Sequence, residues 1–438
     1  MADTASTLTI EEQKAALPKL ERLPGYSIWV MIMSVLCFMC FYIVMNCTNV
    51  FGVLIKEQMG INATELSLLG TGTMITFCLG PMFLSKYAEN LGIKIYVPIA
   101  LAVNIVCGLM LLMPWAQTYW GYFVTRFLAG FAGMINGPLA GQLCMWFPKK
   151  GRGFATGVMI GALGVGFTVT ALLANPLLEA GFDWIHSTVI LSTVPSIVIG
   201  LIYIFGVKDF RDVYPGAESV DDLLPEQDDS KRSHRFDNLP KPATNAEVWR
   251  DKRLWFAATF IATTGVIVYG LGYTLPLFFQ NDLGLSLAES SAIIAATFIW
   301  KIVASPTGGF MSDVLFRGER YQTDMIGNAA AGVMMFVTIF VANSTGGDVG
   351  IITVMIIITF FCASIYGGTF KTFPLELAQP SAVYAASGML VGVANIGSLI
   401  TTPICGALID ATGTAAAALV FLGIVAFIGV PLAKRIND

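Results

Sequence analysis

Two basic residues inside apolar stretches are the strongest candidates for chemistry in this sequence. Lys301 lies in the middle of the apolar stretch 287–312, and Arg126 lies early in the stretch 119–146. A charge at the centre of a membrane helix costs about 2.5 to 3.5 kcal/mol on insertion scales unless it is paired or hydrated. Lys301 has no acidic residue within one helical turn. Two such cations facing a water-filled cavity would attract a carboxylate or a phosphate, because Arg offers a bidentate fork and Lys a point charge.

Each of these residues has a second interpretation. Arg126 could serve helix packing or gating instead of contacting a substrate. Lys301 could reach the membrane surface only by spanning about half the bilayer, so we expect it to face a cavity. Lys371 lies near the end of the stretch 348–374, and we expect it at the membrane interface or in a gate.

Twelve long apolar stretches must position these residues. A hydrocarbon core about 30 Å thick needs roughly 20 helical residues to cross it, and a helix satisfies its backbone hydrogen bonds internally. Only 12% of the residues are charged, and the mean hydropathy is +0.72. We therefore predict an all-α integral membrane protein with twelve transmembrane helices in two pseudo-symmetric bundles of six. The helices are expected at 27–55, 65–87, 93–113, 119–146, 152–178, 185–207, 254–280, 287–312, 324–343, 348–374, 381–409 and 413–433.

The stretches and the charges divide the chain into five parts. These are an N-terminal tail (1–26), a first six-helix bundle (27–207), a charged central loop (208–253), a second bundle (254–433) and a C-terminal tail (434–438). Lys and Arg accumulate in cytoplasmic loops, and here they gather on the side that holds both tails and the central loop. We predict a multi-pass protein of the plasma membrane, the inner membrane in a bacterium, with both termini cytoplasmic.

Composition and motifs argue against several classes of protein. The net charge of −4 gives no support for nucleic-acid binding. Cys37 and Cys40 have a CxxC spacing, but they lie in a predicted membrane helix without His or Cys partners, so we predict no metal site and no cofactor. No phosphate-binding loop or buried acid–base pair supports an enzyme. A membrane receptor or sensor remains an alternative of another class, although the central loop is short for a signalling domain.

The turns that follow the second and the eighth predicted helix are similar, because each contains an acidic residue. Glu89 lies in the turn after the second, and Asp313 ends the eighth ahead of basic loop residues. An acid at a helix end can form a charge-assisted latch that breaks when two halves of a protein move apart. We assign Glu89, Asp313, Arg152 and Lys371 to such a latch or gate. The alternative is a simple solvated turn.

These features resemble the major facilitator superfamily over residues 26–435. The resemblance rests on the turn Gly309 to Asp313 and on the run Trp146 to Gly157, which leads into a Gly-rich helix. It implies two six-helix bundles that rock about a site near the midplane, with helices 1, 4, 7 and 10 lining the cavity. The segments Val50–Glu57 and Ser305–Asp313 are similar to the monocarboxylate transporters and the oxalate:formate antiporters. In that branch a helix 1 Lys corresponds to a position near Asn49.

We therefore predict a secondary active or facilitative transporter of a small organic anion, and we favour a carboxylate. It would work by alternating access, as an anion exchanger or a proton symporter, and we expect a monomer in the lipid bilayer. Aromatic stripes usually serve packing, but here they could form apolar walls around an organic anion. A proton-coupled exporter of a neutral or cationic compound is the alternative. The predicted substrate-binding residues are Arg126, Lys301, Asn49, Tyr269, Trp300 and Tyr366.

Overall fold

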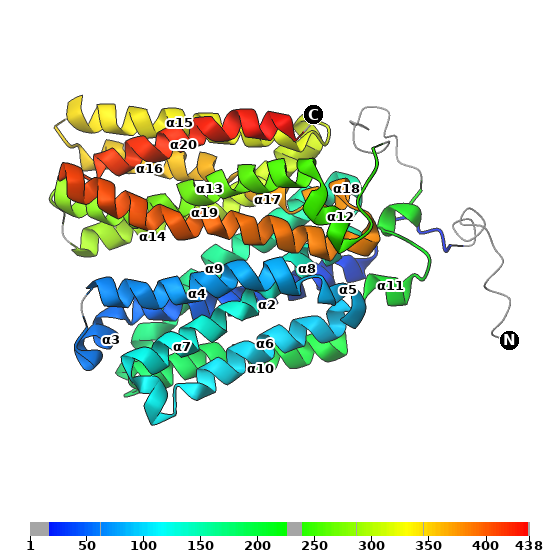
Figure 1. The fold of residues 1–438 in the computed structure, drawn as a ribbon, viewed down its shortest axis with the longest axis horizontal. Helices are drawn as coiled ribbons and strands as arrows, with labels where there is room; N and C mark the ends of the chain where they lie inside the picture. The colour runs from blue at the N-terminus through cyan, green and yellow to red at the C-terminus, as the bar shows by residue number, and fades with distance from the viewer. Residues whose placement is uncertain (1–16, 62, 226–238, 286, 345, 437–438) are drawn as a thin grey trace.

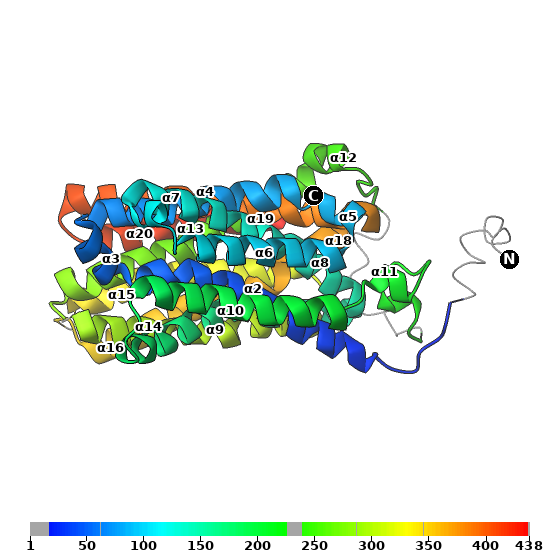
Figure 2. The ribbon, with the colours of Figure 1, turned by 90° about the horizontal axis from the view of Figure 1, so that it is seen from below.

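The computed structural model describes residues 17–61, 63–225, 239–285, 287–344 and 346–436. Those residues form helices joined by turns, without a strand. Figure 1 shows two groups of helices side by side, α2 to α10 and α13 to α20. The short helices α5, α11, α12 and α18 lie together at one end, which we call the linker end. Figure 2 shows that the long helices of both groups run along the same axis toward the opposite end.

The first group of helices forms the N-terminal half. Thr118 and Asp183 cap two of its helices by accepting hydrogen bonds from Gly121 N and His186 N. The elements are α2 Gly25–Val50, α3 Gly52–Met59, α4 Ala63–Leu84, α5 Tyr87–Leu91, α6 Ile93–Met110, η1 Pro114–Gln117, α7 Tyr119–Ala129, η2 Gly130–Ile135, α8 Asn136–Trp146, η3 Lys149–Gly151, α9 Arg152–Glu179 and α10 Trp184–Gly206.

A linker and the C-terminal half follow. The linker contains α11 Phe210–Val213, η4 Val220–Asp222 and α12 Asn245–Arg250. The second half contains α13 Lys252–Leu277, η5 Phe278–Asp282, α14 Leu287–Phe310, η6 Met311–Leu315, α15 Arg320–Ser344, α16 Val349–Ser364, α17 Gly367–Phe370, α18 Phe373–Leu377, η7 Pro380–Ala382, α19 Val383–Thr412 and α20 Ala416–Arg435.

The twelve-helix membrane architecture is confirmed. Within the described residues, ten helices are long and apolar enough to cross a membrane. The other two spans are α4, whose apolar part is Leu68–Leu84, and the broken helix α7–η2–α8. The stretch 119–146 was predicted as one helix, but residues 130–135 form a 3-10 segment. They pack so closely on α4 that a Cβ atom on Gly130 would lie 2.1 Å from Thr76 Oγ1.

The tenth predicted helix is also interrupted. The stretch 348–374 is divided into α16, α17 and the start of α18. The first break falls at residues 365–366, and Gly367 and Gly368 follow it at the start of α17, which lies against α14. A Cβ atom on Gly368 would lie 2.5 Å from the carbonyl oxygen of Ser305, so only glycine fits this close approach.

Small residues bring the two halves together. A Cβ atom on Gly309 of α14 would lie 2.1 Å from the carbonyl oxygen of Gly153 on α9, and one on Gly388 of α19 would lie 2.1 Å from that of Pro81 on α4. Such positions let helix backbones approach closely inside a membrane. Figure 1 shows the ribbons of the two halves closer together toward the linker end than at the opposite end.

Candidate functional site

A cavity lies between the two halves, and both contribute to its wall. It encloses about 470 Å³ of space that atoms do not occupy, its open side included. Aromatic rings and small polar groups make up most of the lining, with one basic residue among them. The lining residues are Tyr42, Phe77, Asn136, Ile160 and Leu163 from the N-terminal half, and Ile261, Gly265, Tyr269, Lys301, Tyr366, Phe370, Val391, Ala394, Asn395 and Ser398 from the C-terminal half.

Lys301 is the basic residue of this lining. Its side chain is 3% exposed, and we find no hydrogen bond or ion pair for its ammonium group among the described residues. Its neighbour Ile302 packs on α9, where a Cβ atom on Gly164 would lie 3.0 Å from the Ile302 side chain. The α9–α14 contact therefore holds this part of α14 against the other half. The result is a buried cation beside a cavity whose described lining residues include no acid.

Four further residues predicted to bind substrate occupy different places in the structure. Tyr269 and Tyr366 line the cavity together with Lys301. Trp300 is not among the lining residues, and it is 43% exposed. One position along a helix turns a side chain by about 100°, so neighbours in sequence face different surroundings. The side chain of Asn49 lies outside the described part of the structure.

Arg126, which the sequence predicts to bind substrate, is not among the lining residues of this cavity. Its guanidinium group is buried and donates to two backbone carbonyl oxygens of α2, those of Val44 at 2.7 Å and Met45 at 3.1 Å. The physical reason is its place on α7, where the side chain meets α2 within the same half. Arg126 therefore ties two helices together in this structure.

Lys371 lies much nearer to the cavity than an interfacial residue would. It is 2% exposed and lies at the end of α17. Its ammonium group donates to Asn136 Oδ1 on α8 and lies 4.6 Å from the centre of the Phe370 ring. Asn136 and Phe370 both line the cavity. The bond from Lys371 to Asn136 therefore joins the two halves at the cavity wall.

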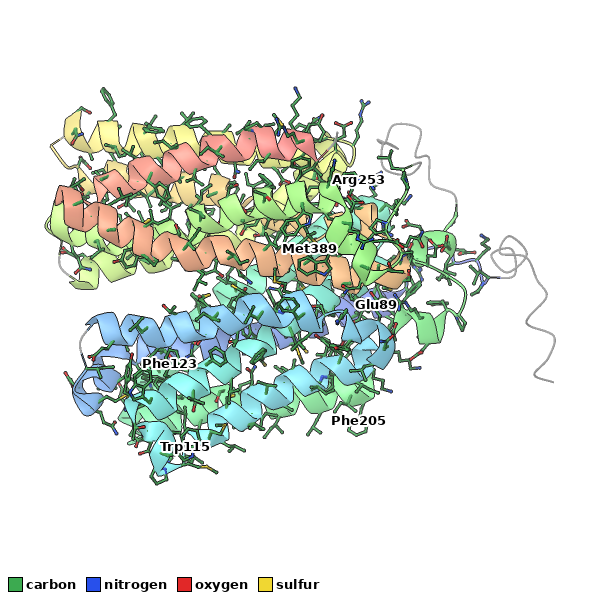
Figure 3. The ribbon with its side chains drawn as sticks, in the orientation of Figure 1. Glu89, Trp115, Phe123, Phe205, Arg253 and Met389 are labelled. Atoms are coloured by element: carbon green, nitrogen blue, oxygen red, sulfur yellow. The ribbon has the colours of Figure 1, made fainter. Side chains whose placement is uncertain are left out.

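Glu89 belongs to a cluster at the linker end, together with Arg211 and Tyr384. Figure 3 shows Glu89 on α5 near the boundary between the halves. Its Oε1 accepts from Tyr384 N of α19 at 2.8 Å, and its Oε2 accepts from Arg211 at 3.3 Å. The carboxylate thus satisfies a backbone N–H at the start of a helix in the other half. Burial raises the pKa of Glu89 to about 7, although the Tyr384 N–H and Arg211 favour the charged form.

Asp313 belongs to a corresponding cluster, together with Phe154, Arg320 and Glu376. Its Oδ2 accepts from Phe154 N near the start of α9 at 3.3 Å. Arg320 is fully buried and donates to Asp313 Oδ1, and its Nε donates to Glu376 Oε1 at 3.1 Å. In both clusters an acid from one half contacts the first turn of a long helix in the other half.

Arg152, a basic residue assigned to the latch, contacts neither Glu89 nor Asp313 among its described partners. Its Nη2 lies 2.7 Å from Asp221 Oδ2 in the linker, and its Nε donates to the carbonyl oxygens of Cys144 and Phe147. It begins α9, so its side chain extends toward the linker. The cations that contact the two acids are Arg211 and Arg320.

Asp324 is a buried carboxylate that the sequence did not single out. The ninth helix was predicted to begin at this residue, which would place it at a membrane surface. The observed helix α15 begins at Arg320, and Asp324 is 1% exposed. Its Oδ1 accepts from Thr369 Oγ1, and its Oδ2 has no partner among the described residues. The short turn between Asp313 and Arg320 is the signal that could have placed Asp324 one turn deeper.

Comparison with known proteins decides the family. Residues 34–388 match the model of the Major Facilitator Superfamily. The chain belongs to the Major Facilitator Superfamily. It is a transporter and not an enzyme, as its sequence predicted.

Several curated relatives of this superfamily member are transporters by name. A phosphoglycerate transporter protein of Salmonella typhimurium is 23% identical over 89% of this chain and 84% of its own length. A cis,cis-muconate transport protein of Acinetobacter baylyi is 25% identical over 63% of both chains. A hexuronate transporter of Bacillus subtilis is 20% identical over 84% of this chain and 85% of its own. These relatives give no support to the specific monocarboxylate or oxalate:formate branch.

Solved structures share the fold of this transporter. The proton:xylose symporter XylE aligns over 95% of this chain and 97% of its own with a TM-score of 0.72 and 12% identity. The human organic anion transporter MFSD10 aligns over 94% of this chain and all of its own with a TM-score of 0.69 and 11% identity. At this identity the likeness concerns the fold alone.

Proposed function

We propose that this protein is a secondary transporter of a small organic anion, which Lys301 binds in the cavity between the halves. The observation that carries the proposal is a buried ammonium group in a cavity lining that holds no acid. A cation without a counter-ion in such a place is costly, and a bound anion would offset that cost. A cationic substrate would lack any negative partner in this lining.

The relatives support an anion as the substrate. Those that carry phosphoglycerate, muconate and hexuronate in their names are transporters of small organic anions, and a further relative is a probable nitrate/nitrite antiporter of Thermus thermophilus. We favour an anion with a carboxylate group. The rings of Tyr42, Tyr269 and Tyr366 would surround its carbon skeleton.

We further propose that the linker end faces the cytoplasm of a cell whose plasma membrane holds the protein. Lys and Arg residues of the loops gather at this end, and such residues accumulate on the cytoplasmic side of membranes. The Glu89 and Asp313 clusters would then act as cytoplasmic latches. Their bonds cross between the halves, so both clusters must open when the cavity opens to the cytoplasm.

Counterflow in proteoliposomes tests the proposal. Purified protein would be reconstituted and loaded with one unlabelled compound at a time, and uptake of labelled carboxylates, organic phosphates and cations would be measured. We expect uptake of one class of anion, reduced at least tenfold by Lys301→Gln and partly retained by Lys301→Arg. Lys94→Gln is the matched control, because Lys94 is an exposed lysine at the start of α6. Uptake of a cation, or anion uptake unchanged in Lys301→Gln, would contradict the proposal.

A further inference from the structure

We infer that Lys371 is the second cation of the substrate site, and that the site selects anions with two negatively charged groups. The inference rests on the proposed function and makes its substrate class more specific: a dicarboxylate or a phosphorylated carboxylate. Lys301 would hold one charged group. Lys371 would exchange its bond to Asn136 for the other.

The position of Lys371 is the first argument. The residue before it, Phe370, lines the cavity, and so does Asn136, which accepts the hydrogen bond from its ammonium group. Lys371 itself is covered by these two neighbours and is not part of the present lining. A shift of the Asn136 side chain would therefore open a direct path from the cavity to the ammonium group.

The incomplete neutralisation of Lys371 is the second argument. An ammonium group has three N–H donors, yet the described partners of Lys371 are one neutral amide oxygen and the face of one aromatic ring. We find no carboxylate within ion-pair distance of it in the described part of the chain. By contrast, four arginines are each paired with an acid: Arg152, Arg211, Arg253 and Arg320. Lys301 and Lys371 are thus two buried lysines near one cavity without acidic partners.

The location of the Lys371–Asn136 bond supplies the third argument. It joins α17 of one half to α8 of the other, so it must break when the halves separate at the linker end. An ammonium group that loses its amide partner inside the membrane needs another acceptor. A second anionic group on the substrate would provide that acceptor with a full charge, and it would bind a charged donor more strongly than the amide does.

Matched pairs of anions, one member with two charged groups (here called the dianion) and one with a single charged group (the monoanion), test the inference. Half-saturation would be measured by counterflow for succinate against butyrate, and for 3-phosphoglycerate against glycerate, with the full-length protein in liposomes. In the wild type we expect the dianion of at least one pair to bind at least tenfold more tightly than its partner. Lys371→Gln should remove that preference, because it should weaken binding of the dianion at least tenfold more than binding of the monoanion. Lys371→Arg should keep the preference.

A second substitution distinguishes the loss of the Lys371 charge from misfolding of the Lys371→Gln variant. Asn136→Asp leaves Lys371 in place but gives it a permanent counter-ion at hydrogen-bond distance, so it should remove the preference for the dianion as Lys371→Gln does. A preference for the monoanion in the wild type, or a dianion preference that survives both substitutions, would overturn the inference. Neither result would affect the proposed function, which fails if the protein takes up a cation or if Lys301→Gln leaves anion uptake unchanged.

Discussion

The Glu89 cluster predicts that opening of the linker end depends on pH. In the closed structure burial raises the pKa of Glu89 to about 7, against an ordinary value of 4.5. When the halves separate, Glu89 gains water and its pKa falls toward the ordinary value. The closed form therefore binds more protons than the open form between these two values. Linkage requires that acid favours the closed form, and that this advantage is lost as the pH rises through 7.

The size of the effect follows from the two pKa values. Each pKa unit corresponds to about 1.36 kcal/mol, so between pH 5 and pH 8 the closed form loses about 2.5 kcal/mol relative to the open form. This is on the order of a 50-fold change in the ratio of closed to open protein. Glu89→Gln should remove the dependence, because the amide oxygen still accepts from Tyr384 N but the side chain no longer titrates.

Distances between spin labels measure this equilibrium directly. Asn90 on α5 and Gln379 before α19 are exposed residues of opposite halves at the linker end, so cysteines introduced there in a cysteine-free background can carry the labels. The fraction of long distances should rise between pH 5 and pH 8 in the wild type and stay constant in Glu89→Gln. A pH-independent distribution in the wild type, or an equal shift in both proteins, would refute the reasoning.

Three further substitutions have distinct expected results. Arg126→Ala should lower the melting temperature but change the half-saturation concentration for the anion by no more than about twofold. A rise of that concentration by more than tenfold would show that Arg126 contacts the substrate. Arg320→Ala should cost about 3 to 5 kcal/mol of stability because it leaves buried acids unpaired, while Arg317→Ala on the exposed loop should stay within about 0.5 kcal/mol in the same unfolding assay. Gly309→Val should increase the fraction of long distances between the spin labels, because a Cβ atom there would lie 2.1 Å from the carbonyl oxygen of Gly153 on α9. Gly161→Ala should leave that fraction unchanged, because a Cβ atom at Gly161 would lie 3.5 Å from the nearest atom of α14.

The sequence by itself determined the membrane fold and the place of Lys301 beside a cavity. Long apolar stretches with few charges leave the helix as the structure that satisfies the backbone in lipid, so the twelve spans could be predicted from composition. A lysine in the middle of such a stretch cannot be solvated by lipid, so its orientation toward a cavity could be predicted too. Tyr269 and Tyr366 line that cavity as predicted.

Only the tertiary structure decided how the other charges are used. Arg126 and Lys371 are both single cations in apolar stretches, yet one donates to carbonyl oxygens within its own half and the other reaches a cavity residue of the other half. The difference depends on the rotation of each helix and on which glycines let its neighbour approach, and neither follows from hydropathy. The same reason explains Arg320 and Asp324, which are buried because α15 begins one turn earlier than its apolar pattern indicates.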